Sequence, residues 1–201
     1  MNEFTWIING LEFQFVTCDF LFSPTAVDRG TSKMIELADK MKAESPVESM
    51  CLNTNNDLTL DLGCGYGVVG IYFAKLLGAK NVVMSDVNPV ALEYAKKNAI
   101  LNGVGEVQII ESDGFKNINL TGFKQIFVNP PYHVDFSVPK HFIEKGFNRL
   151  AIGGKMHMVT KRKDWYKNKL TSIFGGVKVV ESDGYYLFCA EKRQLRYGKI
   201  E

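Results

Sequence analysis

The sequence predicts an α/β protein whose mainly parallel sheet carries helices on both faces. From residue 58 onward, short runs rich in β-branched residues alternate with amphipathic helical segments, and this alternation is typical of right-handed βαβ units. The last two β-rich runs, "VKVVES" and "YYLFCAE", meet at Asp183-Gly184, a pair that favours a tight hairpin. We therefore expect an antiparallel strand pair at one edge of the sheet. With 201 residues, the chain is long enough for one substantial core.

The N-terminal part lacks this alternation and predicts a short extension of the core. Asn9-Gly10 lies between two apolar runs in "FTWIINGLEFQF", which is the strongest short-range signal for a β-hairpin. A helix is expected from Thr31, because apolar residues follow it at helical spacing. Either Thr31 or Ser32 is placed to cap the first turn of that helix.

The core is expected to contain seven strands with helices between them. The remaining predicted strands are "LTLDLG", "NVVMSD", "VQIIESD", "QIFVNP" and "KMHMVT". The predicted helices are "VVGIYFAKLLG", "PVALEYAKKNAILNG", "PKHFIEKGFNRLA" and "DWYKNKLTSIFG". Pro89 suits a first helical turn, and Gly153-Gly154 is expected to close the third of these helices. The polar residues 44–57 predict a loop, so the expected units are the hairpin and helix extension, 1–56, and the core domain, 57–201.

Composition favours an ordinary globular protein. Hydrophobic residues make up 46% of the chain and charged residues 23%, and a net charge of +2 is too small to indicate that the whole surface binds nucleic acid. No apolar run approaches the ~18 residues that a membrane span needs, and no basic leader precedes an apolar run at the N-terminus. The 4 cysteines are scattered, without a CxxC pair or a neighbouring histidine. We therefore expect reduced thiols in a cytoplasmic protein, and no metal site.

A glycine-rich turn follows the first core strand, in "DLGCGYGVVG". Gly63, Gly65 and Gly67 allow a tight turn and the close approach of a ligand to the backbone. The pattern is D-x-G-x-G-x-G, and the carboxylate of Asp61 favours a cationic ligand over a pyrophosphate. A tight turn without any ligand is the alternative for this stretch alone.

Two further acids follow the next two predicted strands. Asp86 lies roughly 20 residues beyond the glycine turn, where an acid usually binds ribose hydroxyls in related sheets. A carboxylate can accept from both hydroxyls of a diol, although Asp86 could instead cap a helix. Asn88 is a competing cap, which leaves Asp86 freer for a ligand. Asp113 in "ESDGF" either bonds an adenine amino group or forms a turn.

The stretch "FVNPPYH" ends the fourth strand of this series abruptly. Two successive prolines lack N–H groups, so no central strand continues through them. The residues form either a rigid site at a strand end or a stiff connector with Tyr132 packed in the core. All these loops follow parallel strands, whose carboxyl ends are where open α/β sheets bind ligands. Their convergence on one crevice favours a site.

Taken together, these loops resemble the small-domain family of class I S-adenosylmethionine-dependent methyltransferases. The resemblance rests on "FLFSPTAVDRGTSKMIE", "DLGCGYGVVGI", "DVNPVALEYAKKNAILNGV", "SDGF" and "NPPYH", and runs from about Phe20 to the C-terminus. It implies a Rossmann-like fold with S-adenosylmethionine as the cofactor and S-adenosylhomocysteine as the product. The cofactor contacts that it implies are Thr31, Asp61, Gly63, Cys64, Gly65, Gly67, Asp86, Val87, Asp113, Gly114 and Asn129.

The resemblance also implies an enzyme that methylates an exocyclic amine, because the family includes bacterial ribosomal RNA guanine-N2 methyltransferases. Asn129 Oδ1 and the Pro130 carbonyl would accept hydrogen bonds from that amine. Tyr132 would stack on an extruded base, and His133 would contact the base or a phosphate, or receive the lost proton. Guanine N2 in RNA is the leading expectation. Adenine N6 and the amide of a protein glutamine are alternatives, and a non-catalytic cofactor-binding scaffold is the alternative of another class.

A basic and aromatic stretch, "TKRKDWYKNK", follows the strand after the double proline. Lys161, Arg162 and Lys163 could hold a phosphate backbone, and Trp165 could stack on an unpaired base. A solvated helix face with Trp165 half-buried is the alternative. RNA is therefore the expected partner, through a local patch rather than through the net charge.

Overall fold

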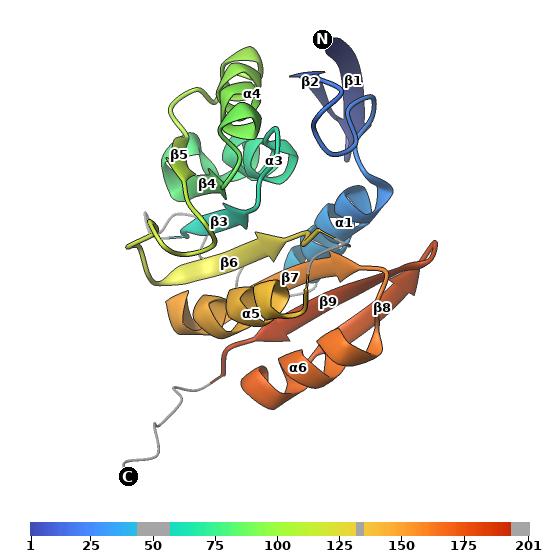
Figure 1. The fold of residues 1–201 in the computed structure, drawn as a ribbon, viewed down its shortest axis with the longest axis vertical. Coiled ribbons are helices and arrows are strands. Elements are labelled where there is room, and N and C mark those ends of the chain that lie inside the picture. The colour runs from blue at the N-terminus through green and yellow to red at the C-terminus, as the bar shows by residue number, and fades with distance from the viewer. Residues whose placement is uncertain (44–56, 132–134, 194–201) are drawn as a thin grey trace.

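The computed structural model describes residues 1–43, 57–131 and 135–193, and its centre is a seven-stranded sheet (Figure 1). The strand order is β5-β4-β3-β6-β7-β9-β8. The neighbours from β5 to β7 pair in parallel, and β9 runs antiparallel to both β7 and β8. The strands are β3 (Thr59–Leu62), β4 (Val82–Asp86), β5 (Gln108–Glu111), β6 (Phe123–Val128), β7 (Leu150–Thr160), β8 (Lys178–Ser182) and β9 (Tyr185–Glu191).

This arrangement confirms the predicted α/β fold, including the antiparallel pair at the sheet edge. Asp183 and Gly184 both have positive φ angles, of 51° and 77°, as a two-residue hairpin turn with the twist of its strands requires. The reversed strand is β9, which lies between β7 and the edge strand β8.

Helices cover both faces of the sheet (Figure 1). One buried cluster joins the sheet to α1, α3 and α4, and the other joins it to α5 and α6. On β3, Leu60 and Leu62 point into the second cluster. Because side chains alternate along a strand, Asp61 faces the first. The helices are α1 (Arg29–Ala43), α3 (Val68–Leu77), the short 3₁₀ turn η1 (Ala79–Asn81), α4 (Pro89–Leu101), α5 (Ser137–Arg149) and α6 (Asp164–Phe174).

Two predicted boundaries are wrong. The first helix begins at Arg29 rather than at Thr31, because Asp28 Oδ2 accepts the backbone N–H of Thr31 at 2.9 Å and caps the turn. Gly153-Gly154 does not close α5, because α5 ends at Arg149 and both glycines lie inside β7. A Cβ atom at Gly154 would lie 2.6 Å from the carbonyl oxygen of Phe123. Glycine there therefore lets β7 pass close to the start of β6.

The N-terminal hairpin consists of β1 (Asn2–Ile8) and β2 (Leu11–Thr17), joined by the predicted turn at Asn9-Gly10. Its aromatic side chains pack against α3: Phe13, for example, lies 5.7 Å from the ring of Tyr72. Residues 44–56 of the predicted loop lie outside the described residues, and the division into units 1–56 and 57–201 stays a prediction.

Asn98 of α4 and Asn102, the residue that caps the end of this helix, bind the free edge of β2. Asn98 Oδ1 accepts the N–H of Val16 at 2.8 Å, and its Nδ2 donates to the Val16 carbonyl at 3.0 Å. Asn102, one helical turn later, makes the same pair of bonds to Gln14, at 3.1 and 2.7 Å. Since residues i and i+4 of a helix share a face, the two amides meet alternate residues of the strand. They act as a substitute for a neighbouring strand.

None of the helices in the described ranges is long and apolar enough to cross a membrane.

Candidate functional site

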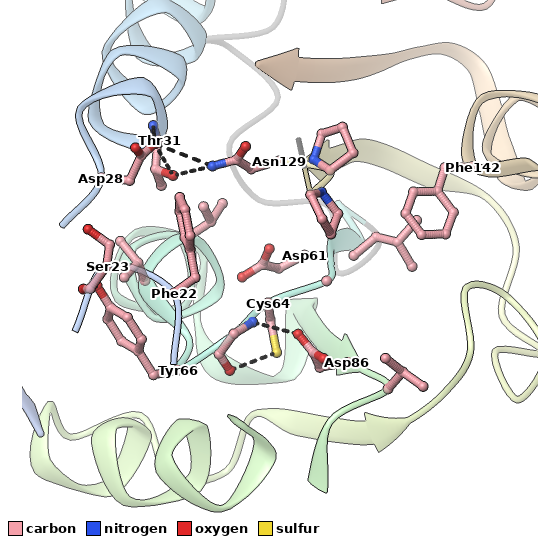
Figure 2. A pocket seen from close by; sticks show the side chains of 18 of the residues that line it. Phe22, Ser23, Asp28, Thr31, Asp61, Cys64, Tyr66, Asp86, Asn129 and Phe142 are labelled. Carbon is pink, nitrogen blue, oxygen red and sulfur yellow. Dashed lines mark hydrogen bonds between the residues drawn. The ribbon is translucent and has the colours of Figure 1, made fainter. Parts of the chain in front are cut away.

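A cavity of about 550 Å³ lies at the carboxyl ends of β3, β4, β5 and β6, under the N-terminus of α1 (Figure 2). In the sheet, β4 and β5 follow one another on one side of β3, whereas β6, the next strand in the sequence, pairs with the other side of β3. Open α/β sheets bind ligands at such a reversal of strand order. The volume is within the range of small-molecule sites, ~300–1,000 Å³.

The glycine turn leaves room for a ligand against the backbone. Gly63 and Gly65 have φ angles of 75° and 55°, in the left-handed region that side chains disfavour. A Cβ atom built on either would meet nothing within 4 Å, so both positions face open space. Gly67 does not line the cavity: a Cβ there would lie 2.9 Å from Ile71 and 3.5 Å from Ala95. Its structural contribution is the close packing of α3 and α4.

Asp61 is a buried carboxylate inside the cavity, and Figure 2 shows it between Asn129 and Cys64. Its Oδ2 accepts the N–H of Gly70 at 2.8 Å. A Cβ at Gly70 would lie 2.3 Å from Met84, so only glycine brings this N–H so close. Burial raises the pKa of Asp61 to about 7, against the lowering effect of the Gly70 bond and with a smaller raising contribution from Asp86. A cationic ligand would favour its ionised form.

Cys64 also lines the cavity, but its burial raises the pKa of the thiol well above the usual value, with Asp61 and Asp86 adding to the shift. The thiol is therefore neutral at physiological pH and has no thiolate to act as a nucleophile.

Asp86 is the last residue of β4, and its carboxylate holds two backbone segments that border the cavity. Its Oδ2 accepts the N–H of Gly65 at 2.8 Å, and its Oδ1 accepts the N–H of Asn88 at 2.9 Å. Asn88 caps α4 through a bond to Val90 N, as expected. A carboxylate has about four acceptor positions, so each oxygen of Asp86 retains capacity for a hydroxyl. Val87 lines the cavity beside it.

Asp113 and Gly114 follow β5 and also line the cavity. Gly114 adopts a φ of 55°, and a Cβ there would lie 3.1 Å from Phe142 of α5. Phe142 and the nearby Val138 are lining residues that were not expected from the sequence. The signal was their spacing of four on a helix directly after the double proline, which places both on one face.

Asn129 directly follows β6 and points across the cavity to the start of α1 (Figure 2). Its Nδ2 donates to Thr31 Oγ1 at 2.9 Å and to Asp28 Oδ2 at 3.3 Å. A carboxylate only accepts hydrogen bonds, so the group that faces Asp28 must be the NH₂ of the amide. The carbonyl oxygen Oδ1 is then the end of the amide that remains for another donor. Asp28 lies within the stretch that carries the family resemblance but was not among the expected site residues.

The two prolines line the same cavity, and the role expected for the Pro130 carbonyl stays a prediction. Pro130 is buried and Pro131 is exposed. Tyr132 and His133, the other two expected catalytic residues, lie outside the described residues, so their roles stay predictions. Among the residues described, no group of three or more His, Cys, Asp or Glu side chains is placed to hold a metal ion.

The basic stretch lies at the carboxyl end of β7, on the same edge of the sheet. Its three consecutive exposed cations each lie over an aromatic ring: Lys161 over Tyr185 at 5.2 Å, Arg162 over Phe136 at 5.1 Å and Lys163 over Tyr186 at 5.3 Å. Phe136 also stacks on Trp165, with ring centroids 4.5 Å apart. We call Lys161, Arg162, Lys163 and Trp165 the basic face.

Comparison with a protein-family model matches residues 12–189 to the methyltransferase small domain. A Bacillus subtilis (strain 168) protein, uncharacterized YbxB, is 30% identical over 95% of this chain and 92% of its own length. Ribosomal RNA small subunit methyltransferase C of Pseudoalteromonas atlantica is 29% identical over 90% of this chain. That match covers 50% of the longer protein, so the chain spans about half the length of this relative.

Among solved structures, the T. thermophilus 16S rRNA N2 G1207 methyltransferase (RsmC), in complex with AdoMet and guanosine, has a TM-score of 0.83. The match covers 95% of this chain and 50% of that chain, at 24% identity. At this identity, the likeness supports the fold of the sheet and its helices.

Proposed function

The chain belongs to the methyltransferase small domain family, and we propose that it methylates the exocyclic N2 amine of a guanine in ribosomal RNA. Members of this family are S-adenosylmethionine-dependent methyltransferases, and this chain is one of them. The observation that carries the acceptor proposal is the orientation of Asn129, whose Nδ2 bonds to Thr31 and Asp28 leave its carbonyl oxygen for an incoming amine.

The residues of the cavity fit S-adenosylmethionine. Gly63 and Gly65 expose backbone without a side chain in the way, and Asp86 retains acceptor capacity for the two ribose hydroxyls. Asp113 would accept the adenine amino group, and Asp61 would face the cationic end of the molecule. When bound, the cofactor supplies an electrophilic methyl group on a sulfonium.

An exocyclic amine needs help to become a nucleophile, because its lone pair is delocalised into the purine ring. Asn129 Oδ1 and the carbonyl of Pro130 would accept its two N–H groups, which draws the nitrogen toward a tetrahedral shape and aims its lone pair. The backbone at Pro130 and Pro131 is stiff, because each ring locks φ near −65°. Much of the rate acceleration would then come from placement of the amine.

A nucleobase acceptor is also supported by the rim of the cavity. Phe22 lines the cavity and is 58% exposed, so its ring can meet a base that enters from solvent. Stacking of a base on an aromatic ring is worth ~1–3 kcal/mol.

The basic face would hold the RNA backbone near the cavity. Tyr185 lies under Lys161 and donates its hydroxyl to Asp28, which lines the cavity. The face and the cavity are thus joined by direct contacts. Rings under the three cations hold them at defined positions, and each such contact is worth ~0.5–1 kcal/mol at an exposed site. An enzyme acting on ribosomal RNA would work in the cytoplasm.

The test is incubation of the protein with labelled S-adenosylmethionine and undermodified total RNA, followed by mass analysis of the nucleosides. We expect N2-methylguanosine. N6-methyladenosine instead, or label found only in protein glutamine, would refute the guanine proposal in favour of one of its two alternatives.

Asn129→Ala should lower turnover by about 100-fold or more, by analogy with the loss of one group that stabilises a transition state. Its S-adenosylmethionine affinity should stay within about 3-fold, because the amide is assigned to the acceptor. Asn148→Ala, an exposed asparagine of α5, is the matched control and should behave as wild type. Retained turnover in Asn129→Ala would disprove the assignment.

A further inference from the structure

We infer that Asp28 is a positioning residue that dictates which end of the Asn129 amide faces the acceptor. The inference rests on the proposed role of Asn129. Asp28 immediately precedes α1, and 101 positions separate it from Asn129 in the chain. Nothing in the local sequence links the two residues, whereas the fold places both on the wall of one cavity (Figure 2).

The direction of each hydrogen bond follows from the acceptor-only character of the Asp28 carboxylate. Thr31 Oγ1 lies 3.3 Å from Asp28 Oδ2 and donates its proton there. That hydroxyl then has only lone pairs to offer Asn129, which must present its NH₂ at 2.9 Å. The direct contact from Asn129 Nδ2 to Asp28 Oδ2, at 3.3 Å, imposes the same orientation. Both routes leave Asn129 Oδ1 for the substrate amine.

Capping of α1 alone does not account for the arrangement of Asp28. The cap uses one oxygen, Oδ2, which accepts the N–H of Thr31 at 2.9 Å. The other oxygen, Oδ1, accepts the hydroxyl of Tyr185 at 3.2 Å, from a strand 157 positions away. Gly30 permits this approach, because a Cβ there would lie 2.6 Å from the ring of Tyr185. The carboxylate is thus held from both sides, with one oxygen directed at the Thr31–Asn129 pair.

Asp28→Ser separates the two roles, because serine caps helices about as well as aspartate. The serine hydroxyl can accept the Thr31 N–H and donate its own proton to Thr31 Oγ1, which frees the Thr31 hydroxyl to donate to Asn129 Oδ1 and turn the amide around. If the competent orientation falls to 1–10% of molecules, kcat falls about 10- to 100-fold. The dissociation constant of S-adenosylmethionine should change by less than about 3-fold. Asp19→Ser, at an exposed aspartate of the same loop that accepts from Asn2, is the matched control and should leave kcat unchanged.

A swapped pair provides the sharper test. Asn129→Asp places a second carboxylate beside Asp28, so the two repel and the variant should be nearly inactive. In Asp28→Asn/Asn129→Asp, the repulsion is removed, because the asparagine oxygen keeps the cap on Thr31 N–H and the carboxylate introduced at position 129 accepts the Thr31 hydroxyl. The second oxygen of that carboxylate can still face the amine. We expect the double variant to turn over at least about 10-fold faster than Asn129→Asp alone. A double variant no faster than Asn129→Asp would overturn the inference, as would an unchanged kcat in Asp28→Ser or a cofactor affinity that falls in parallel with kcat.

Failure of the proposed function is distinguishable from failure of this inference. If the wild type methylates no guanine, the proposed function fails, and the wild type, Asp28→Asn, Asn129→Asp and the double variant are compared by their thermal midpoints. A direct contact between positions 28 and 129 predicts that the double variant melts higher than the sum of the two single shifts allows. Strictly additive shifts would overturn the inference whatever the substrate.

Discussion

Replacing Asp61 with asparagine should remove most of the pH dependence of cofactor binding. Asp61 is buried in the cavity, and burial raises its pKa to about 7. Because a cationic ligand favours the ionised carboxylate, binding should be coupled to loss of this proton at pH values below 7. Asparagine retains an oxygen for the Gly70 N–H, so the hydrogen bond at 2.8 Å can persist without the charge.

The magnitude follows from the pKa. With a pKa of about 7, roughly nine-tenths of the carboxyl is ionised at pH 8 and roughly one-tenth at pH 6. If only the ionised form binds, the dissociation constant for S-adenosylmethionine rises about 10-fold from pH 8 to pH 6. For Asp61→Asn, we expect weaker binding at pH 8, by ~10- to 100-fold, and little contribution from this position to the pH slope.

Calorimetric titration at pH 6, 7 and 8, in two buffers with different ionisation enthalpies, measures both the affinity and the protons released. The wild type should release nearly one more proton per site at pH 6 than Asp61→Asn does. Titration of the ligand's own amine is common to both proteins and cancels in this comparison. Equal pH slopes and equal proton release would show that Asp61 does not face the cationic part of the ligand.

The raised pKa of Asp61 also predicts how Asp61→Asn changes folding stability, which serves as a control for the binding experiment. A pKa raised from 3.8 to about 7 means that ionisation costs stability, because the unfolded chain loses this proton at lower pH. The cost is absent below about pH 4, grows between pH 4 and 7, and is fully present above 7, with an upper bound of ~4 kcal/mol. The ligand-free Asp61→Asn variant should therefore be more stable than wild type at pH 8, and weak cofactor binding by it would not reflect unfolding.

Other features of the structure make equally direct predictions. The double variant Lys161→Glu/Arg162→Glu should weaken RNA binding and reduce the slope of log affinity against log salt concentration by about two charges. The control Lys80→Glu/Lys124→Glu, at the opposite ends of the strands, should leave that slope nearly unchanged. An unaltered slope in Lys161→Glu/Arg162→Glu would mean that the basic face is only solvated surface. Asn98→Ala should lower the free energy of unfolding by ~2–4 kcal/mol in denaturant titration, because the variant leaves the partly buried backbone groups of Val16 and the buried carbonyl of Tyr66 without this partner. A loss below about 0.5 kcal/mol would mean that water replaces the amide.

The strands and turns of this protein follow from local rules, which is why they were predictable. The alternation of β-rich and amphipathic segments predicted the seven strands, and Asn9-Gly10 and Asp183-Gly184 predicted hairpins that require positive φ. One prediction failed because a distant contact overrides a local signal. Gly153-Gly154 is typical of a helix stop, but the approach of Phe123 makes the pair part of a strand.

The sequence by itself determined which loops meet at the cavity, because parallel strands with right-handed connections bring all their carboxyl ends to one edge. It could not determine the direction of the Asn129 amide, since the two side chains that orient it lie at the start of α1, 98 and 101 positions away. The fastening of β2 by α4 was equally hidden, because it depends on amides 82 and 88 positions from their partners. Local steric rules act between neighbours in the chain, whereas these contacts exist only once the two hydrophobic clusters have packed the helices onto the sheet.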